Sequence, residues 1–190
     1  VDKWTYIRQY QQAGIYVFMA LPNQKHNAVA GGFHNSFNSE NELSQWISQY
    51  PEYLSGNVGI DLSKSQLVVI DIDKHKHNGM QSISAWFRAH SINPETIQET
   101  YIERTPTGGL HVFYLIASGR DKPKHVINVI DGVDVLSNTA VMTAPSIMKD
   151  GEYRQITPFE TIQEAPDWVY QLVNYHGGTN TPDAKQTSRY

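Results

Sequence analysis

The chain has 190 residues, a formal net charge of −4, 39% hydrophobic residues and 18% charged residues. This composition is typical of a globular protein and excludes a wholly disordered chain. The length fits one domain, or one domain built of two lobes. There is no cysteine, which excludes disulfides and thiolate metal sites. No apolar run approaches the ~20 residues that a membrane helix needs. We therefore expect a cytoplasmic protein that does not enter a membrane.

The two ends of the chain suggest a piece of a longer protein. The sequence begins at Val1 without an initiator Met. Residues 177–190 are small and polar and have no periodicity, which predicts a flexible tail or a linker to a further C-terminal region. Residues 1–176 are predicted to form the folded domain.

Apolar spacing in the first half of the chain predicts helices and buried strands. Helices are expected at Trp4–Gln11, at Leu43–Tyr50 behind a capping box at Ser39–Glu42, and around Met80–Phe87. Strands are expected at Ile15–Leu21, Asn57–Asp61 and Leu67–Ile72. Residues 22–38 are predicted to form a polar loop that contains Lys25.

The second half of the chain is predicted to be mostly strands. A hairpin is expected between Gln98–Arg104 and Leu110–Ile116, around a turn at residues 105–109. Further strands are expected at Val126–Ile130, Val133–Leu136, Thr139–Thr143 and Glu152–Ile156, and a final helix at Pro166–His176. This order predicts an α+β fold with mixed or antiparallel sheets and flanking helices, because a doubly wound fold alternates strands and helices regularly.

Two aspartates, Asp71 and Asp73, end the predicted strand Leu67–Ile72. Because strand side chains alternate, the two carboxylates face the same side of the sheet, with Cα atoms ~7 Å apart. Two ionised carboxylates at this spacing repel one another, and a divalent cation between them removes the repulsion. The pattern indicates a metal site, and a solvated acidic turn at a strand end is an equally open interpretation.

A second motif, Thr105-Pro-Thr-Gly-Gly-Leu-His111, leads into an apolar strand. Gly108 and Gly109 allow close backbone approach and can present amide groups to an anion. His111 is expected on the same face as Gly109, which would leave space above the imidazole for a ligand. The alternative is a core histidine whose ring nitrogens bond to backbone groups, and for a lone histidine we favour it.

A third acid, Asp134, lies between Val133 and Val135. A buried carboxylate without partners is costly, so Asp134 needs a cation, a cluster of hydrogen bonds or a proton. The alternative is a strand edge at which the carboxylate faces water.

The order of these motifs is more specific than any one of them. Asp71-Ile-Asp73 after an apolar strand, Gly108-Gly-Leu-His111 at the start of a strand, and the later Val133-Asp134 step together resemble the archaeo-eukaryotic primase superfamily. The closest resemblance is to the prim-pol domain of bifunctional DNA primase/polymerases from plasmids, phages and other mobile elements. The chain departs from the family pattern in the early loop, where Lys25-His-Asn27 replaces a frequent Lys-x-Pro.

The resemblance implies a primase-like fold, a prim-pol catalytic domain over residues 1–176 and an active site in a cleft between two lobes. It implies template-directed nucleotidyl transfer, as a DNA polymerase, a primase or both, in the replication of a mobile element. DNA template and primer and (deoxy)nucleoside triphosphates would be the substrates, and a helicase region or partner would accompany the domain.

The resemblance also implies roles for individual residues. Asp71, Asp73 and Asp134 would hold two divalent ions, Mg²⁺ or Mn²⁺, and with His111 would form the catalytic set. His111 would contact the phosphates of the incoming nucleotide. The remaining nucleotide-binding residues would be Lys25, Thr107, Gly108, Gly109 and Ser146.

Two other functions use the same residues. A metal-dependent nuclease or phosphoesterase would direct the acids at water and not at a 3′-hydroxyl. A catalytically silent nucleic-acid-binding or replisome-docking module would carry the acids only as surface charge, and the intact set of Asp71, Asp73, His111 and Asp134 argues against it.

The acidic net charge leads to a prediction about DNA. We expect this chain to bind duplex DNA weakly, with an affinity that falls only shallowly as salt rises, because few phosphates are neutralised. Each neutralised phosphate contributes a slope of about −0.9 to the plot of log K against log salt. Fluorescence anisotropy with an unprimed duplex at several salt concentrations measures this slope. Tight and steeply salt-dependent binding would contradict the prediction.

Overall fold

The structure is a computed structural model that describes residues 2–175. The predicted tail at 177–190 therefore lies outside the described residues. The α-helices are α1 (Lys3–Gln12), α2 (Glu40–Gln49), α3 (Gly79–Ala89) and α4 (Asp167–Tyr175). Short 3-10 helices are η1 (Gly32–His34), η2 (Pro51–Tyr53), η3 (Pro94–Glu99) and η4 (Phe159–Thr161).

The strands form one large sheet and two small ones. The seven-stranded sheet has the order β11 (Arg154–Gln155), β4 (Tyr101–Arg104), β5 (Leu110–Leu115), β3 (Leu67–Ile72), β7 (Val133–Leu136), β6 (Val126–Ile130), with β12 (Gln163–Glu164) also paired to β5. The three-stranded sheet has the order β1 (Val17–Ala20), β2 (Asn57–Asp61), β8 (Ala140–Met142), and β9 (Ile147–Met148) pairs with β10 (Gly151–Glu152). Every pair is antiparallel except β12–β5, so the predicted α+β fold with mixed or antiparallel sheets is confirmed.

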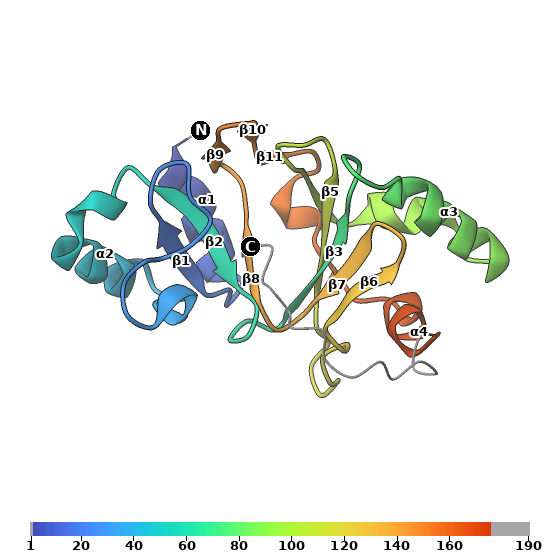
Figure 1. Ribbon diagram of the computed structural model, residues 1–190. Coiled ribbons are helices and arrows are strands. Elements are labelled where there is room, and N and C mark those ends of the chain that lie inside the picture. Colours follow the sequence, from blue (N-terminus) through green and yellow to red (C-terminus); the bar gives the residue numbers. More distant parts are fainter. Residues whose placement is uncertain (1, 176–190) are drawn as a thin grey trace.

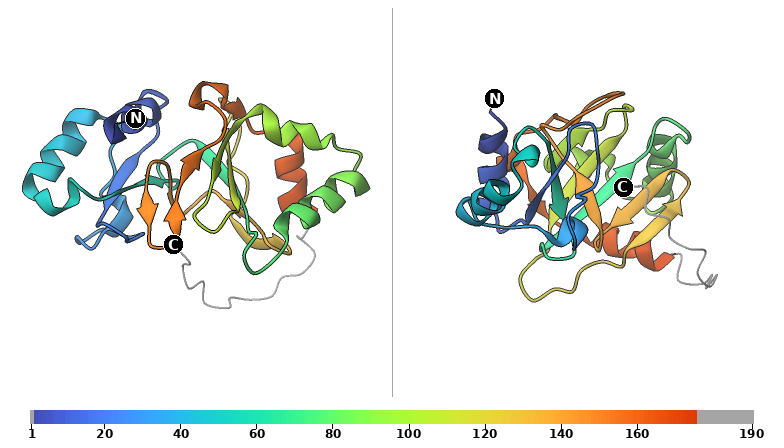
Figure 2. Two further views of the ribbon diagram at one scale, coloured as in Figure 1. Left: turned by 90° about the horizontal axis from the view of Figure 1, so that it is seen from above. Right: turned by 60° about the vertical axis from the view of Figure 1, so that its left-hand side comes forward.

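α3 and α4 cover one face of the large sheet, and the three-stranded sheet with α1 and α2 lies on the side of the other face. In Figure 1, α1 and α2 lie with β1, β2 and β8 on the left, and α3 and α4 lie on the outer right-hand side of the large sheet. Figure 2 shows the same division from above. The consecutive strands β2 and β3 belong to different sheets, and the chain crosses from one sheet to the other between Asp61 and Leu67.

Two hydrophobic clusters follow from side-chain alternation in the large sheet. Val68 and Ile70 of β3 face α3 and α4 and pack with Ile83 and Trp168. Val69, the residue between them, belongs to the other cluster, which includes residues of α1 and α2. The next residue on the Val69 face of β3 is Asp71, so the same face is apolar in its middle and polar where β3 ends.

Most of the predicted elements are confirmed, and two differ for local reasons. The predicted strand Gln98–Arg104 begins only at Tyr101, because a 3-10 helix occupies Pro94–Glu99. The Asn93 side chain caps this helix by accepting a hydrogen bond from Glu95 N at 3.0 Å. The predicted strand Glu152–Ile156 is divided between two sheets, since β10 pairs with β9 and β11 pairs with β4. The buried Tyr153 separates the two halves.

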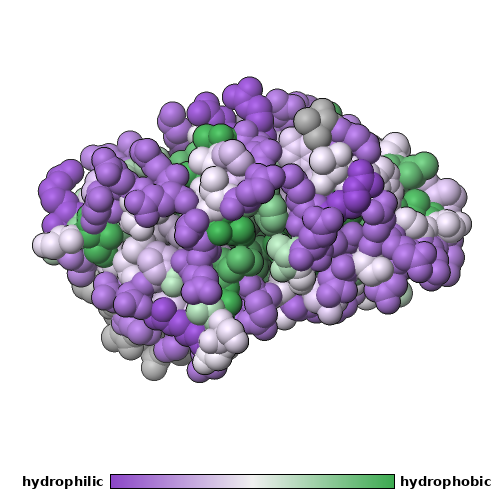
Figure 3. Space-filling model, turned by 180° about the vertical axis from the view of Figure 1, so that it is seen from behind, coloured by the Kyte–Doolittle hydropathy of each residue, from purple (hydrophilic) through white to green (hydrophobic). Residues whose placement is uncertain are grey.

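No helix within residues 2–175 combines the length and the apolar character needed to cross a bilayer. The back of the molecule, seen in Figure 3, is mostly hydrophilic, with small separate hydrophobic areas. The large hydrophobic side chains that are exposed come from separate segments of the chain. They are Leu54, Ile127, Ile147 and Ile156.

The packing of α2 leads to a stability prediction. Leu43 is fully buried in the cluster that joins α2 to the large sheet. Leu43→Ala should lower the free energy of unfolding by about 2–5 kcal/mol, because it removes apolar contact and leaves a cavity. Gln45→Ala, at an exposed position of the same helix, is the control and should change stability by less than about 0.5 kcal/mol. Urea unfolding of both variants measures the difference, and equal midpoints would contradict this packing.

Candidate active site

The register of four neighbouring strands aligns four polar residues in one row. Asp71 of β3 lies directly opposite His111 of β5 and directly opposite Asp134 of β7. His111 in turn lies opposite Glu103 of β4. Residues directly opposite one another on antiparallel strands share a face, so all four side chains project from the same side of the sheet.

The resemblance predicts that Asp71 and Asp134, which are far apart in the chain, lie at one metal site. The two aspartates are cross-strand partners, so they do share a face. Asp73 follows β3 by one residue, two positions after Asp71, and lines the same pocket.

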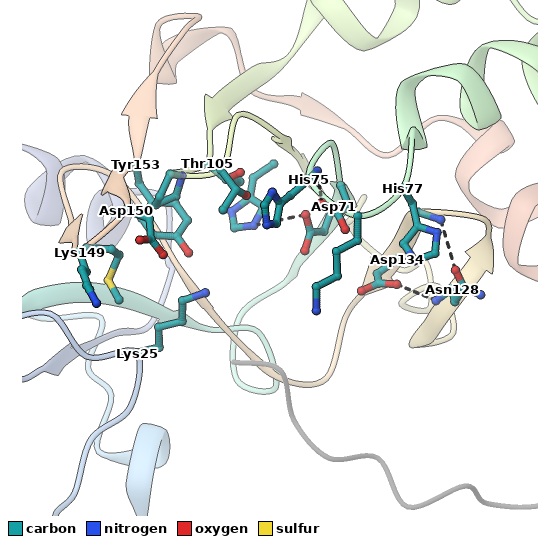
Figure 4. Close-up of a pocket in the computed structure, with 17 residues that line it drawn as sticks. Lys25, Asp71, His75, His77, Thr105, Asn128, Asp134, Lys149, Asp150 and Tyr153 are labelled. Carbon is teal, nitrogen blue, oxygen red and sulfur yellow. Dashed lines mark hydrogen bonds and ion pairs between the residues drawn. The ribbon is translucent and has the colours of Figure 1, made fainter.

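The row ends in a pocket of about 400 Å³. Acids line it, namely Asp71, Asp73, Asp134 and Asp150, and so do basic side chains, namely Lys25, Lys76, Lys149, His75 and His77. Figure 4 shows Lys25 and Lys149 on one side of the pocket and Asp71 and Asp134 on the other. Lys25 comes from the loop after β1 and Lys149 from the turn between β9 and β10, so segments outside the large sheet contribute the facing cations.

Each of the three predicted metal ligands has a neighbour that interacts with it. Asp134 accepts a hydrogen bond from Asn128 N at 2.6 Å, which Figure 4 marks, and Asp73 accepts one from His75 N at 2.8 Å. Asp71 Oδ1 lies 3.7 Å from His111 Nε2.

These acids fit a divalent cation by donor type and by backbone placement. Carboxylate oxygens are the ligands that Mg²⁺ and Mn²⁺ prefer, and the shared face supplies a common direction. In the side-chain conformations found here, no three His, Asp or Glu side chains within residues 2–175 are close enough together to hold a metal ion.

His111 lines the pocket and is nearly fully buried, as the interpretation of a core histidine predicts, although its Nδ1 has no hydrogen-bond partner within residues 2–175. Only 1% of the residue is exposed, and its ring centroid lies 5.6 Å from that of Tyr153 and 6.0 Å from that of Phe113. Burial and, after it, the charges of Asp71 and Glu103 raise the pKa of the Tyr153 phenol well above its ordinary range. Tyr153 therefore stays protonated beside the imidazole.

The Gly-Gly turn brings Thr105 and Thr107 to the pocket, but neither glycine is among the residues that line it. Gly108 has φ +88°, a conformation that favours glycine, and its N–H donates to Thr105 O at 2.9 Å. A Cβ on Gly109 would lie 2.5 Å from Ile72 O. Gly109 is thus needed for the close approach of this turn to the end of β3.

The structure does not bring Ser146 to the pocket. Ser146 is 2% exposed, and its hydroxyl donates to Val58 O and accepts from Val58 N, both at 2.8 Å. These two bonds fasten the segment after β8 to β2. Lys25, Thr107 and His111, by contrast, all line the pocket as the nucleotide-site prediction requires.

Sequence reasoning missed Glu103, a fully buried carboxylate. Its Oε1 accepts hydrogen bonds from Tyr101 Oη at 2.5 Å, Thr143 Oγ1 at 2.5 Å, Ala144 N at 3.0 Å and Tyr10 Oη at 3.1 Å. The predicted hairpin contained the signal, because alternation places a charged residue on a strand face where burial requires partners. Lys149 was also missed, since a lysine in a surface turn has no local signature.

A known protein family matches most of this chain. The family model described as "Bifunctional DNA primase/polymerase, N-terminal" (Prim-Pol) matches residues 7–168, a range that contains every residue of the row and of the pocket. The chain belongs to the Prim-Pol family. No curated protein matches it. Membership confirms the resemblance seen in the sequence and indicates DNA primase/polymerase nucleotidyl transfer, with DNA and nucleotides as the substrates of this Prim-Pol domain.

The tyrosines around Glu103 lead to a prediction about alkaline pH. Burial and, after it, the charge of Glu103 raise the pKa values of Tyr10 and Tyr101 well above the ordinary value of 10.0. Above that pH the unfolded chain has released these protons and the folded chain retains them. The unfolded state then binds fewer protons, so stability is present below pH ~10 and is lost as pH rises further.

We therefore expect some phenols to ionise only as the protein unfolds. Phenolate absorbance and far-UV circular dichroism, followed together from neutral to strongly alkaline pH, measure this. The control is the same titration in concentrated urea, where all 11 tyrosines are exposed. Complete ionisation of every tyrosine with native circular dichroism would contradict the prediction.

Proposed function

We propose that this Prim-Pol domain transfers nucleotides to a primer 3′-hydroxyl on a DNA template, as a DNA polymerase, a primase or both, and that the pocket is its active site. The observation that supports this most strongly is the arrangement of charge. Acids that can hold cations lie on the sheet, and Lys25 and Lys149 face them from other segments. A nucleoside triphosphate with its metal ions carries the complementary charges. Phosphoryl transfer depends mainly on this kind of charge neutralisation and positioning.

In this proposal Asp71, Asp73 and Asp134 hold two divalent ions, Mg²⁺ or Mn²⁺. When bound, such ions activate the attacking hydroxyl and stabilise the leaving pyrophosphate. The register supports the assignment, because Asp71 and Asp134 are opposite one another and Asp73 lies at the end of the same strand.

The cationic side of the pocket would bind the triphosphate. Lys25 and Lys149 supply positive charge on this side, Lys76 adds a cation from the loop between β3 and α3, and the Thr107 hydroxyl supplies a donor. His111 would donate from Nε2 to a phosphate oxygen. Gly108, Gly109 and Ser146 would act indirectly, by holding segments next to the pocket in place, since their observed contacts are with Thr105, Ile72 and Val58.

We propose further that substrates enter between the three-stranded sheet and the large sheet, as between two lobes. The support is that Lys25 and the acids come from segments on opposite sides of the pocket. A role in replication of a mobile genetic element and a helicase region or partner are proposed from the family resemblance.

Primer extension tests this function. With labelled deoxynucleotides, a primed template and Mg²⁺ or Mn²⁺, the chain should lengthen the primer. Asp71→Ala should reduce incorporation by at least about 100-fold, because a charge that organises the reacting phosphates is lost. The melting temperature should stay within a few degrees, because removal of one carboxylate also relieves its repulsion with Asp134.

Asp121→Asn is the matched control, since Asp121 is exposed and lies outside the pocket lining. This variant should extend primers as the wild type does. A shortened primer would indicate the nuclease alternative, and binding without any change in the primer would indicate a silent module. Wild-type incorporation by Asp71→Ala would refute the role of this aspartate.

A further inference from the structure

Two arginines lie directly opposite one another at the edge of the large sheet. Arg104 is the last residue of β4, and its partner on the edge strand β11 is Arg154. Both residues are exposed. Directly opposite residues on antiparallel strands share a face, with Cβ atoms about 4.5–5.5 Å apart, so two positive side chains leave the sheet from adjacent positions.

No acid within residues 2–175 compensates this pair. Neither Arg104 nor Arg154 forms an ion pair there, whereas Arg120 pairs with Asp167 at 2.8 Å. Like charges directly opposite one another are destabilising. An anion that binds from outside the chain would offset this repulsion.

The arginine pair adjoins the pocket without lining it. Thr105 follows Arg104 and Tyr153 precedes Arg154 in the sequence, and Figure 4 shows both of these neighbours at the pocket. Leu110, the residue opposite Arg104 on β5, packs against the cluster that includes α3 and α4. The arginines therefore project from the reverse face of the sheet, one residue away from the lining of the pocket.

The chemistry of the pair selects phosphate. A guanidinium group presents a rigid fork of N–H donors that binds phosphate oxygens in pairs, and it stays charged at every physiological pH. A small ligand inside the pocket lies on the other face of the sheet. A DNA strand, by contrast, carries a phosphate at every nucleotide and continues beyond any site that holds one of its ends. The position of the pair outside the pocket therefore favours DNA.

We propose that Arg104 and Arg154 form a binding site for the phosphates of a DNA strand that extends from the pocket. The contact holds the backbone of the primer–template and carries no sequence information, because the phosphates are the same at every base. The inference rests on the proposed function in one respect, namely that a primer–template occupies the pocket.

DNA binding tests the site without nucleotide. The probe is a fluorescein-labelled primer–template with a single-stranded overhang, followed by anisotropy at several salt concentrations. Arg104→Gln and Arg154→Gln should each raise Kd roughly 10-fold at low salt. Each should also make the plot of log K against log salt less steep, by about 0.9 for a lost duplex phosphate or about 0.7 for a lost single-strand phosphate. An unchanged Kd and slope in both variants would overturn the proposal.

Arg88→Gln is the matched control. Arg88 is an exposed arginine in the last turn of α3, outside the pocket lining, and it forms no ion pair within residues 2–175. The substitution removes the same charge, and Kd should stay within about 2-fold of the wild-type value because distant surface charges are screened. A loss as large as that of Arg104→Gln would assign the effect to net charge and would rule out the site.

Thermal unfolding separates binding from a structural role. Removal of one of two facing like charges should leave the melting temperature unchanged or raise it. Arg104→Lys keeps the charge and should therefore keep the wild-type salt slope, with a Kd between those of the wild type and Arg104→Gln. Weaker DNA binding together with a melting temperature several degrees lower in both glutamine variants would indicate a structural role and refute the proposal.

Primer-extension kinetics distinguish DNA from the triphosphate as the source of the phosphates. In Arg104→Gln, KM for the primer–template should rise while KM for the nucleotide stays at the wild-type value. A rise confined to KM for the nucleotide would contradict the assignment to DNA. The expected binding changes in a protein that extends no primer would support the site and refute the proposed function. Wild-type DNA binding by both glutamine variants of an active enzyme would refute the site alone.

Discussion

The antiparallel register of β4, β5, β3 and β7 is the constraint on which the site depends. It places Glu103, His111, Asp71 and Asp134 in one row on one face of the sheet. A slip of one residue in any of these strands would turn its polar side chain towards α3 and α4, where the sheet packs against apolar residues. The hydrophobic alternation that buries Val68 and Ile70 therefore also determines which way the acids point. The same side-chain alternation along β3 therefore determines both the packing of the core and the position of Asp71.

The buried carboxylate of Glu103 links parts of the chain that belong to different sheets. Its donors come from α1, from β4 and from the segment that follows β8. Such a network is favourable only when its members are satisfied together, since a buried charge without partners is strongly destabilising. The network therefore supports the large sheet and the segment that leads to Lys149 as one unit. Lys149 on one side of the pocket and Asp71 on the other therefore belong to segments that this network connects.

The charges of the pocket explain how an acidic protein can act on polyanions. The net charge of −4 is a property of the whole surface, whereas Lys25, Lys76 and Lys149 are gathered at one pocket. In the proposed function, the acids beside them would hold the cations that accompany a triphosphate. Recognition of this kind would be local, and the chain belongs to the Prim-Pol family, whose model covers residues 7–168.

The sequence alone determined the features that depend on neighbouring residues. The helices and most strand bounds follow from local periodicity, capping and turn chemistry. The family resemblance follows from the order of the Asp71-Ile-Asp73, Gly-Gly-Leu-His111 and Val133-Asp134 motifs. Only the tertiary structure decided that β2 and β3 lie in different sheets, that Gly109 packs on Ile72 and Ser146 on Val58, and that Lys149 reaches the pocket. It also decided that Glu103 faces His111. Apart from the Glu103–His111 pair, which lies within the predicted hairpin, these facts depend on contacts between distant segments, where the free energy comes from burial and register across the whole fold and not from any short stretch of sequence.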